Sequence, residues 1–299
     1  MLQLIRTTNI DFMGKRKFGF AFSGLLVLVA LLLVVFKGPR LGVDFAGGAL
    51  VWVRFAQPVE TDQIRTSLEK IGKAKASIQR LSGTNEFVIR ADVKEDPGKF
   101  ADDVISRLTD YFKDNVPELR DKEAVEPRIS KEMTTKMLWA VLLALVLMAV
   151  YIWFRFDFRF GVCSTLALFH NIAVVAGVLV LTGREFTIPI VGALLTIMGY
   201  AINDTIVVSD RVRENIKKLR GKPLGEVINT SINETLSRTL MTGLFVIITL
   251  FCLFFFGGPV IADFAFTLVI GLIFGTYSSI FIVCALVVDL EERLPRKRR

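Results

Sequence analysis

Cysteine and histidine are scarce in this chain, and their scarcity removes several classes of function. Among 299 residues there are three cysteines and one histidine. Cys163, Cys252 and Cys284 all lie in apolar stretches, whereas disulfide frameworks and zinc sites need cysteines or histidines grouped at characteristic spacings. No nucleophile stands in a recognisable set with a base. We therefore expect no enzyme activity, no bound metal and no cofactor.

Hydrophobic residues, by contrast, make up 53% of the chain and are gathered in long runs. Six runs approach or exceed the length that crosses a bilayer: 18–36, 137–154, 161–181, 187–208, 240–256 and 264–288. One such run can be a buried core helix of a soluble protein, but six together predict a polytopic α-helical membrane protein. The first run is longer than a typical signal-peptide core and lacks a small-x-small cleavage site, so we expect an uncleaved span.

The net charge of +8 is distributed unevenly. Lysine and arginine are concentrated at 1–17, between the second and third spans, at 209–239 and at 289–299, whereas the third-to-fourth connection has only Arg184. The positive-inside bias then places both termini in the cytoplasm and the segment 37–135 on the outer side of the membrane. Nucleic-acid binding is the rival explanation of a basic chain, but these charges adjoin apolar spans, so topology and contact with the lipid bilayer explain them better.

The long segment 37–135 reads as strand, helix, strand, strand and helix, which predicts a small α+β domain of ferredoxin-like type. It is entered through the sequence GVDFAGG, which carries Gly42, Asp44, Gly47 and Gly48. The order of these glycines matches neither a dinucleotide-binding nor a Walker pattern. We interpret them as a tight entry into the strand at 49–55. Binding of an extended chain along an edge of the sheet remains open.

The fourth span contains Asn203, Asp204 and Thr205 inside its apolar run. A carboxylate at that depth costs about 2.5–3.5 kcal/mol on insertion scales. Asp204 is then either a titratable group on a proton path or a packing residue satisfied by a neighbouring helix. Because a neutral asparagine would serve packing at lower cost, the sequence favours the proton path.

Small and polar residues follow the same span at helical spacing: Gly192, Thr196, Gly199 and Asn203. Such a stripe lets another helix approach closely, so we expect this face to contact protein and not lipid. The last span has a GxxxG pair, Gly271 and Gly275, that predicts a second close helix contact.

Two further side chains are candidates for the proton path. His170, followed by Asn171, lies near the middle of the third span, where it either relays protons or donates one hydrogen bond to a neighbouring helix. Arg238 begins the fifth span, and it either approaches Asp204 across an antiparallel pair of helices or extends toward lipid phosphates.

Two basic segments, 209–239 and 1–17, are expected on the inner side of the membrane. The 209–239 connection has an apolar side at helical spacing, which predicts a helix along the inner surface. Residues 1–17 suit either a short interfacial helix or a flexible lead-in.

The stretches GVDFAGG at 42–48 and GYAINDTIVVSDRVREN at 199–215 resemble the SecF members of the SecD/SecF protein-export family. Shorter matches are LSRTL at 236–240, FGGPV at 256–260 and GTYSSI at 275–280, so that the likeness extends over nearly the whole chain. The resemblance implies a resistance-nodulation-division fold and a role in driving unfolded secreted chains outward with the proton gradient. It also implies a heterodimer with SecD and association with the SecYEG channel.

Within that resemblance Asp204 and Arg238 match residues of the proton path. Relatives commonly have His-Asp where this chain has His170 and Asn171, a difference that weakens the case for titration at this position. Two other functions remain as alternatives: a passive membrane scaffold that binds the channel or emerging chains, and a small-molecule exporter subunit of similar fold. The exporter would need a sizeable apolar pocket in its short outer domain.

Overall fold

The computed structural model describes residues 8–71, 76–81, 84–91, 93 and 96–293. The chain forms two compact units. The helical unit comprises 1–40, 140–185 and 189–299, and the α+β unit comprises 41–139 and 186–188. Each unit is described below by itself.

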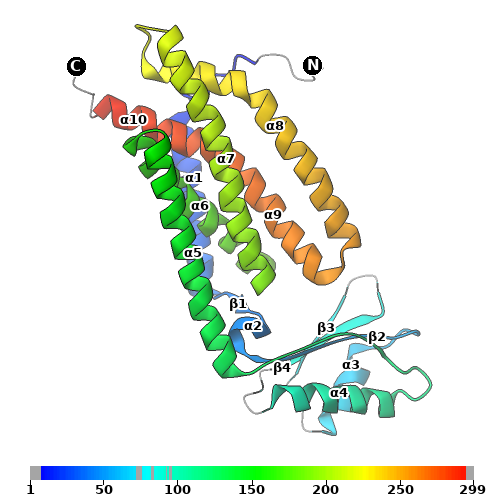
Figure 1. Cartoon of the computed structure of the whole chain (residues 1–299). Coiled ribbons are helices and arrows are strands. Elements are labelled where there is room, and N and C mark those ends of the chain that lie inside the picture. Colours follow the sequence, from blue (N-terminus) through cyan, green and yellow to red (C-terminus); the bar gives the residue numbers. More distant parts are fainter. Residues whose placement is uncertain (1–7, 72–75, 82–83, 92, 94–95, 294–299) are drawn as a thin grey trace. The chain divides into compact units, whose positions relative to one another are not determined.

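Among the described residues, six helices are long and apolar enough to span a membrane, which confirms the predicted fold class. The first five are α1 (Arg16–Phe36), α5 (Pro127–Arg155), α6 (Phe158–Thr182), α7 (Ile188–Lys218) and α8 (Leu224–Phe256). The sixth consists of three consecutive segments: α9 (Gly258–Ser278), the π-helix η1 (Ser279–Cys284) and α10 (Ala285–Arg293) (Figure 1). The sequence did not predict the π-helical turns, which often occur at functional sites.

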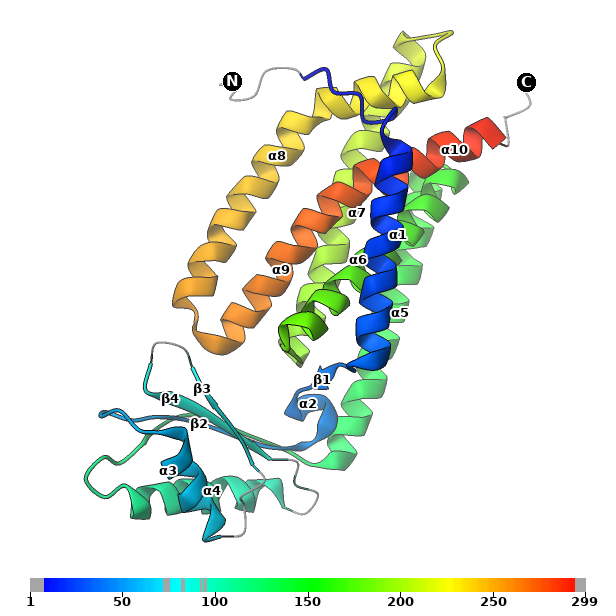
Figure 2. The same cartoon turned by 180° about the vertical axis from the view of Figure 1, so that it is seen from behind.

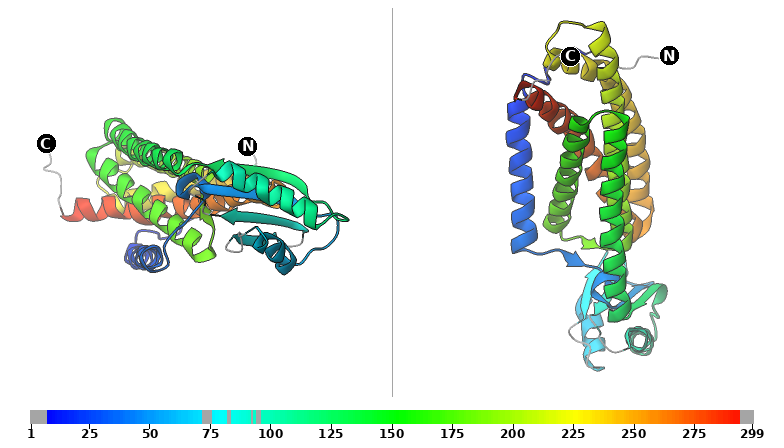
Figure 3. Two further views of the ribbon diagram at one scale, coloured as in Figure 1. Left: turned by 90° about the horizontal axis from the view of Figure 1, so that it is seen from below. Right: turned by 60° about the vertical axis from the view of Figure 1, so that its left-hand side comes forward.

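Close approach of small residues holds the helical unit together. A Cβ atom placed on Gly177 of α6 would lie 2.5 Å from the Cβ of Ala30 in α1. One on Gly19 of α1 would lie 2.8 Å from a ring carbon of Phe281 in η1. Helix α1 therefore stands directly against α6 and the last span (Figure 3). In contrast, α5 and α8 expose most of their apolar side chains, as helices in contact with lipid do.

Two expectations concern the end of the helical unit at which α7 ends and α8 begins. The 209–239 connection is divided between the end of α7, which continues to Lys218, and the start of α8 at Leu224. The first turns of α8 run across the end of the bundle before the helix bends along it (Figure 2). Of the segment 1–17, residues 1–7 lie outside the described residues and α1 begins at Arg16. Between them the chain is not helical, and the side chains of Asn229 and Asn233 bind the backbone of Ile10 and Phe12.

The α+β unit has one antiparallel sheet in the order β3-β4-β2-β5. Its strands are β2 (Gly48–Arg54), β3 (Ser77–Arg80), β4 (Glu86–Ala91) and β5 (Glu118–Val125). Helices α3 (Thr61–Glu69) and α4 (Pro97–Tyr111) supply apolar side chains to a shared core with β2 and β4. The core is made of fully buried residues that include Val51, Val53, Phe87, Ile89, Ile64, Leu68, Val104 and Leu108.

This arrangement confirms the predicted ferredoxin-like α+β domain and adds a strand to it. β5 pairs with β2 along its whole length, with Val51 opposite Lys122. The sequence of β5, ELRDKEAV, is largely exposed and charged, so it lacks the apolar alternation that marks a strand. A second, two-stranded sheet joins β1 (Arg40–Leu41) to β6 (Glu185–Phe186), and between them the chain forms the short helix α2 (Val43–Ala46) and the long elements described above.

Candidate proton site and its supports

Asp204 lies on the side of α7 that faces α9 and is 8% exposed. The hydroxyl group of Thr276 in α9 donates a hydrogen bond of 2.9 Å to its Oδ2 atom. The carboxyl group therefore points toward a neighbouring helix and not toward hydrocarbon. A charged carboxylate with a single hydroxyl donor is only partly compensated for the water it has lost, so this position suits a group that changes its protonation state.

The two residues next to Asp204 in the motif do not share its contact with α9. Asn203 is exposed on the surface of α7. The hydroxyl of Thr205 donates to the backbone carbonyl of Ala201 one turn earlier, at 3.0 Å. Of the three polar residues predicted as a group, the structure therefore connects only Asp204 to another helix through a hydrogen bond of the described chain.

Two glycines of α9 allow the approach that brings Thr276 to Asp204. A Cβ atom on Gly271 would lie 2.1 Å from Cδ1 of Ile197, and one on Gly275 would lie 3.4 Å from the Cβ of Ala201. The GxxxG pair thus lies against α7, one turn and two turns before the level of Asp204. Thr276 follows Gly275 directly, so the glycine contact also sets the position of the donor.

A second polar group surrounds Tyr277, the residue after Thr276. The hydroxyl of Tyr277 donates to the carbonyl of Gly19 at 2.9 Å and lies 3.0 Å from the hydroxyl of Ser23, both in α1. The ring of His170 lies 6.4 Å from the Tyr277 ring, centroid to centroid. Nδ1 of His170 pairs with Oδ1 of Asn171 at 3.2 Å. Helix α9 therefore connects two buried polar groups, and no described interaction joins His170 to Asp204 itself.

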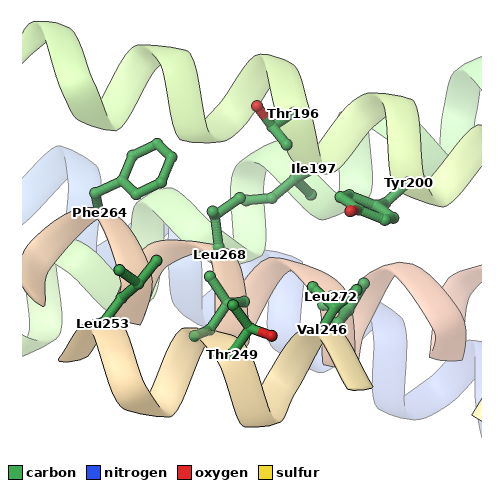
Figure 4. A pocket seen from close by; sticks show the side chains of 10 residues that line it. Thr196, Ile197, Tyr200, Val246, Thr249, Leu253, Phe264, Leu268 and Leu272 are labelled. Atoms are coloured by element: carbon green, nitrogen blue, oxygen red, sulfur yellow. The ribbon is translucent and has the colours of Figure 1, made fainter. Parts of the chain in front are cut away.

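The two glycines of the predicted small-residue stripe of α7 lie against no other described part of the chain. Added Cβ atoms on Gly192 and Gly199 would find nothing within 4 Å, and Thr196 and Asn203 are exposed. A hollow of about 300 Å³ adjoins the stripe (Figure 4). It is lined by Thr196, Ile197 and Tyr200 of α7 and by residues of α8 and α9 that are apolar except for Thr249. This face is therefore open on the isolated chain.

Arg238 does not meet Asp204 in this structure. Arg238 is exposed on α8, and the described chain shows no ion pair between them. The two residues are equally far from the turn at 219–223, so spacing alone suggested a pairing. The carboxyl group of Asp204 points to α9, however, and not to α8, which carries Arg238.

The second half of the same motif holds α7 to other helices near the C-terminal end of α7. Asp210 accepts a hydrogen bond of 2.9 Å from Arg155 of α5. Arg211 donates to Glu234 of α8 at 2.6 Å, and the amide of Asn215 also donates to Glu234 at 2.6 Å. We call this set the α7 clasp. Sequence reasoning missed it, although charged residues at the end of a long apolar run were the available signal.

The glycine motif at the entry to the α+β unit forms a second support, here called the α7 joint (residues 42–48 with 186–188). Oδ2 of Asp44 accepts a hydrogen bond of 3.0 Å from the backbone N–H of Ile188, the first residue of α7. The N–H of Gly42 donates to the carbonyl of Phe186 at 2.7 Å. Gly47 and Gly48 have φ angles of +76° and +114°, which only glycine adopts without strain, and they turn the chain into β2.

The described residues contain no group of histidine, cysteine, aspartate and glutamate side chains able to hold a metal ion.

Comparison with known proteins finds similarity over almost the entire chain. The family model described as "Protein export membrane protein SecD/SecF, C-terminal" matches residues 104–293, and the "SecD/SecF GG Motif" model matches residues 32–59. The protein translocase subunit SecF of Desulfurispirillum indicum is 40% identical over 97% of this chain and 94% of its own length. The SecF subunit of Calditerrivibrio nitroreducens is 38% identical over 96% of each chain.

Two solved structures of a longer protein are also similar. The crystal structure of SecDF from Thermus thermophilus, titled a translocon-associated membrane protein, superposes with a TM-score of 0.85 at 40% identity. It covers 98% of this chain, which spans 40% of that longer chain. A SecDF structure in a super-membrane-facing form gives a TM-score of 0.72 at the same identity.

Proposed function

The chain belongs to the SecD/SecF family of protein-export membrane proteins, and from this premise we propose that it is a translocase subunit that uses the proton gradient to promote export. The observation that supports coupling to protons is the buried carboxyl group of Asp204, which has one hydroxyl donor inside an apolar helix. Each proton that crosses the potential supplies about 2.3 kcal/mol per 100 mV. A few protons per cycle are enough to bias a movement of the α+β unit.

SecD is the proposed partner within the membrane. The similar SecDF protein contains a SecF-like part in one longer chain, and the present chain accounts for 40% of that length. The open stripe of α7, with its hollow, is the surface proposed for SecD, since small residues there leave room for a second helix. One intramembrane acid does not make a complete path, so SecD would supply the remaining groups.

The proposed topology follows the distribution of basic residues. Lysine and arginine flank the inner ends of the spans, which supports two cytoplasmic termini and a periplasmic segment at 37–135 in the inner membrane. There the α+β unit would contact the unfolded chain as it leaves the SecYEG channel.

Within the path, Asp204 is the proposed proton carrier and Thr276 the donor that orients it. Family resemblance assigns Arg238 to the same path, where it would act toward the inner side. Asn203 and Thr205 are included in the proposed path because they adjoin Asp204 inside the apolar run. His170 has a minor part in the proposal because its ring faces Tyr277 and not the carboxyl group.

The test is export in membrane vesicles that contain the channel, SecD and either the natural chain or the variant Asp204→Asn. We expect the variant to assemble with SecD and to export only at the rate seen without a gradient. Asp103→Asn is the control, because it removes an exposed carboxyl group of α4 to which the proposal gives no part. Gradient-stimulated export that survives Asp204→Asn would instead support the passive scaffold.

A further inference from the structure

The α7 joint connects two parts of the chain that are far apart in sequence. Asp44 and Ile188 are separated by 144 residues, yet a hydrogen bond of 3.0 Å joins the carboxylate of one to the N–H of the other. The first N–H groups of a helix have no partner within the helix, and Pro189, which follows, has no N–H at all. Asp44 therefore caps α7 at its first residue, where a negative charge also complements the helix dipole.

The contact is tight on the side of Gly42 as well. A Cβ atom at Gly42 would lie 2.7 Å from Cγ2 of Thr187 and 3.0 Å from the carbonyl oxygen of Phe186. The hydrogen bond from Gly42 to Phe186 closes the same contact. One backbone hydrogen bond, one hydrogen bond to the Asp44 carboxylate and the close packing of Gly42 thus hold residues 42–44 against 186–188.

From the joint the chain passes directly into the middle of the sheet. α2 has only four residues, and Gly47 and Gly48 then turn into β2. β2 pairs with β4 on one side and with β5 on the other. Only the rest of α2 and Gly47 therefore separate the first residue of α7 and its cap from β2, a central strand of the sheet.

The negative charge of Asp44 also affects the pKa of a carboxyl group in the sheet, that of Glu123. Arg90 of β4 and Glu123 of β5 both stand opposite Leu50 of β2. Burial raises the pKa of the Glu123 carboxyl above its ordinary value, and the negative charges of Asp44 and Asp121 raise it further, while Arg90 acts in the opposite direction. The carboxylate that caps α7 is therefore close enough to influence β5.

We propose that Asp44 is a positioning residue that transmits movement of the proton-carrying helix α7 to the sheet of the α+β unit. This inference rests on the proposed function, and it assigns the glycine motif a mechanical part in coupling. The same helix carries Asp204 farther along, so a change at that carboxyl group that moves α7 along its axis would move Ile188 and, through the cap, Asp44 and β2.

The experiment compares Asp44→Ala with Asp44→Asn in vesicles that contain SecD and the channel. The alanine variant loses the acceptor, whereas an asparagine side chain still caps a helix. We expect Asp44→Ala to lower gradient-stimulated export to the gradient-free rate and Asp44→Asn to keep most of the stimulation. Copurification of SecD and labelling of Asp204 by an apolar carbodiimide should stay unchanged in both, which a merely misfolded chain would not allow.

Asp96→Ala is the matched control. Oδ1 of Asp96 accepts from the N–H of Lys99 at 2.9 Å and caps α4 in the same unit. Its loss should leave the stimulation intact. The inference is overturned if Asp44→Ala keeps the natural stimulation, if Asp44→Asn falls as far as Asp44→Ala, or if Asp96→Ala falls equally.

A second pair of variants decides the question if Asp44→Ala does not assemble. Gly42→Ala forces the joint apart without touching Asp44, and adding Thr187→Ser removes the methyl group that the new Cβ would meet. We expect lower stimulation from the single variant and partial recovery in the double variant, and no recovery would overturn the inference. Asp204→Asn separates this result from the proposed function: if it abolishes stimulation while Asp44→Ala does not, the coupling role of the joint alone is wrong.

Discussion

The hydroxyl group of Thr276 is the partner that the buried carboxyl group of Asp204 has in this structure. The sequence pointed to Asp204 because an acid inside an apolar run is expensive. It did not point to Thr276, because a hydroxyl in an apolar helix costs little and satisfies itself on the backbone one turn earlier. Spacing also suggested Arg238 as the partner, but spacing does not fix the direction in which a side chain points.

The hydrogen bond at Asp204 predicts a graded pair of variants at Thr276. Thr276→Val keeps the shape and removes the donor, and a hydrogen bond to a charged group contributes about 1.5–3 kcal/mol. We expect at least a several-fold loss of gradient-stimulated export with Thr276→Val and near-natural export with Thr276→Ser. Equal export by the valine and serine variants would show that the bond has no part in coupling.

The sequence predicted the spanning helices of this chain far better than it predicted β5, the π-helical turns and the contacts between helices. The six spans could be predicted because each is identified by the mean hydropathy of a long run, which a few polar residues change little. The strand β5 escaped prediction because its residues are charged and exposed at the edge of the sheet. The π-helical turns at 279–284 and the clasp at the end of α7 arise from contacts between distant residues, which no local pattern records.

The close contact of Gly271 in α9 with α7 predicts that adding one methyl group at this position destabilises the folded chain. Gly271→Ala would place a methyl group 2.1 Å from Cδ1 of Ile197, and such overpacking costs about 1–3 kcal/mol. We expect a lower midpoint of thermal unfolding in detergent, with recovery when Ile197→Ala is added. Gly24→Ala, on α1 with open space around it, is the control and should unfold at the natural temperature.

The N-terminal segment 8–13 predicts a local effect at the start of α8. Oδ1 of Asn229 accepts from the N–H groups of Phe12 and Met13, and Asn233 binds Ile10 on both its N–H and its carbonyl. Replacing both asparagines by alanine leaves these three N–H groups without their acceptors and the Ile10 carbonyl without its amide donors. Hydrogen exchange at Ile10, Phe12 and Met13 should then accelerate.

Thr230→Ala is the control for that experiment, because the Thr230 hydroxyl binds only the carbonyl of Glu226 in its own helix. Unchanged exchange at residues 10–13 in the double asparagine variant would mean that the two side chains do not hold the segment.

The sheet of the α+β unit predicts a pH dependence with a definite sign. Because the pKa of Glu123 is raised by burial and by nearby Asp44 and Asp121, the folded state binds its proton more tightly than the unfolded state does. The contribution of Glu123 to stability is therefore fully present below its unfolded pKa and is lost as pH rises through its folded pKa. Glu123→Gln should remove this loss, so that protection of β5 amides, corrected for intrinsic exchange, falls less from acidic to neutral pH than in the natural chain.

At the scale of the whole molecule, the stripe of α7 is an exposed surface of the helical unit. A polytopic chain on its own would leave Gly199, Asn203 and the adjoining hollow to lipid, and an exposed amide is poorly suited to that environment. Gly199→Leu should therefore block copurification with SecD. Gly24→Leu, at a similarly open position on α1, should not. Equal copurification of the two variants would place SecD on another face.

Proton exchange at Asp204 is the claim on which the proposed function depends. Infrared difference spectra of the reconstituted complex, recorded as a proton gradient is applied, report the protonation of individual carboxyl groups. We expect a carboxyl band that changes with the gradient in the natural chain and is absent in Asp204→Asn. The same band in both proteins, or no change in either, would contradict the claim.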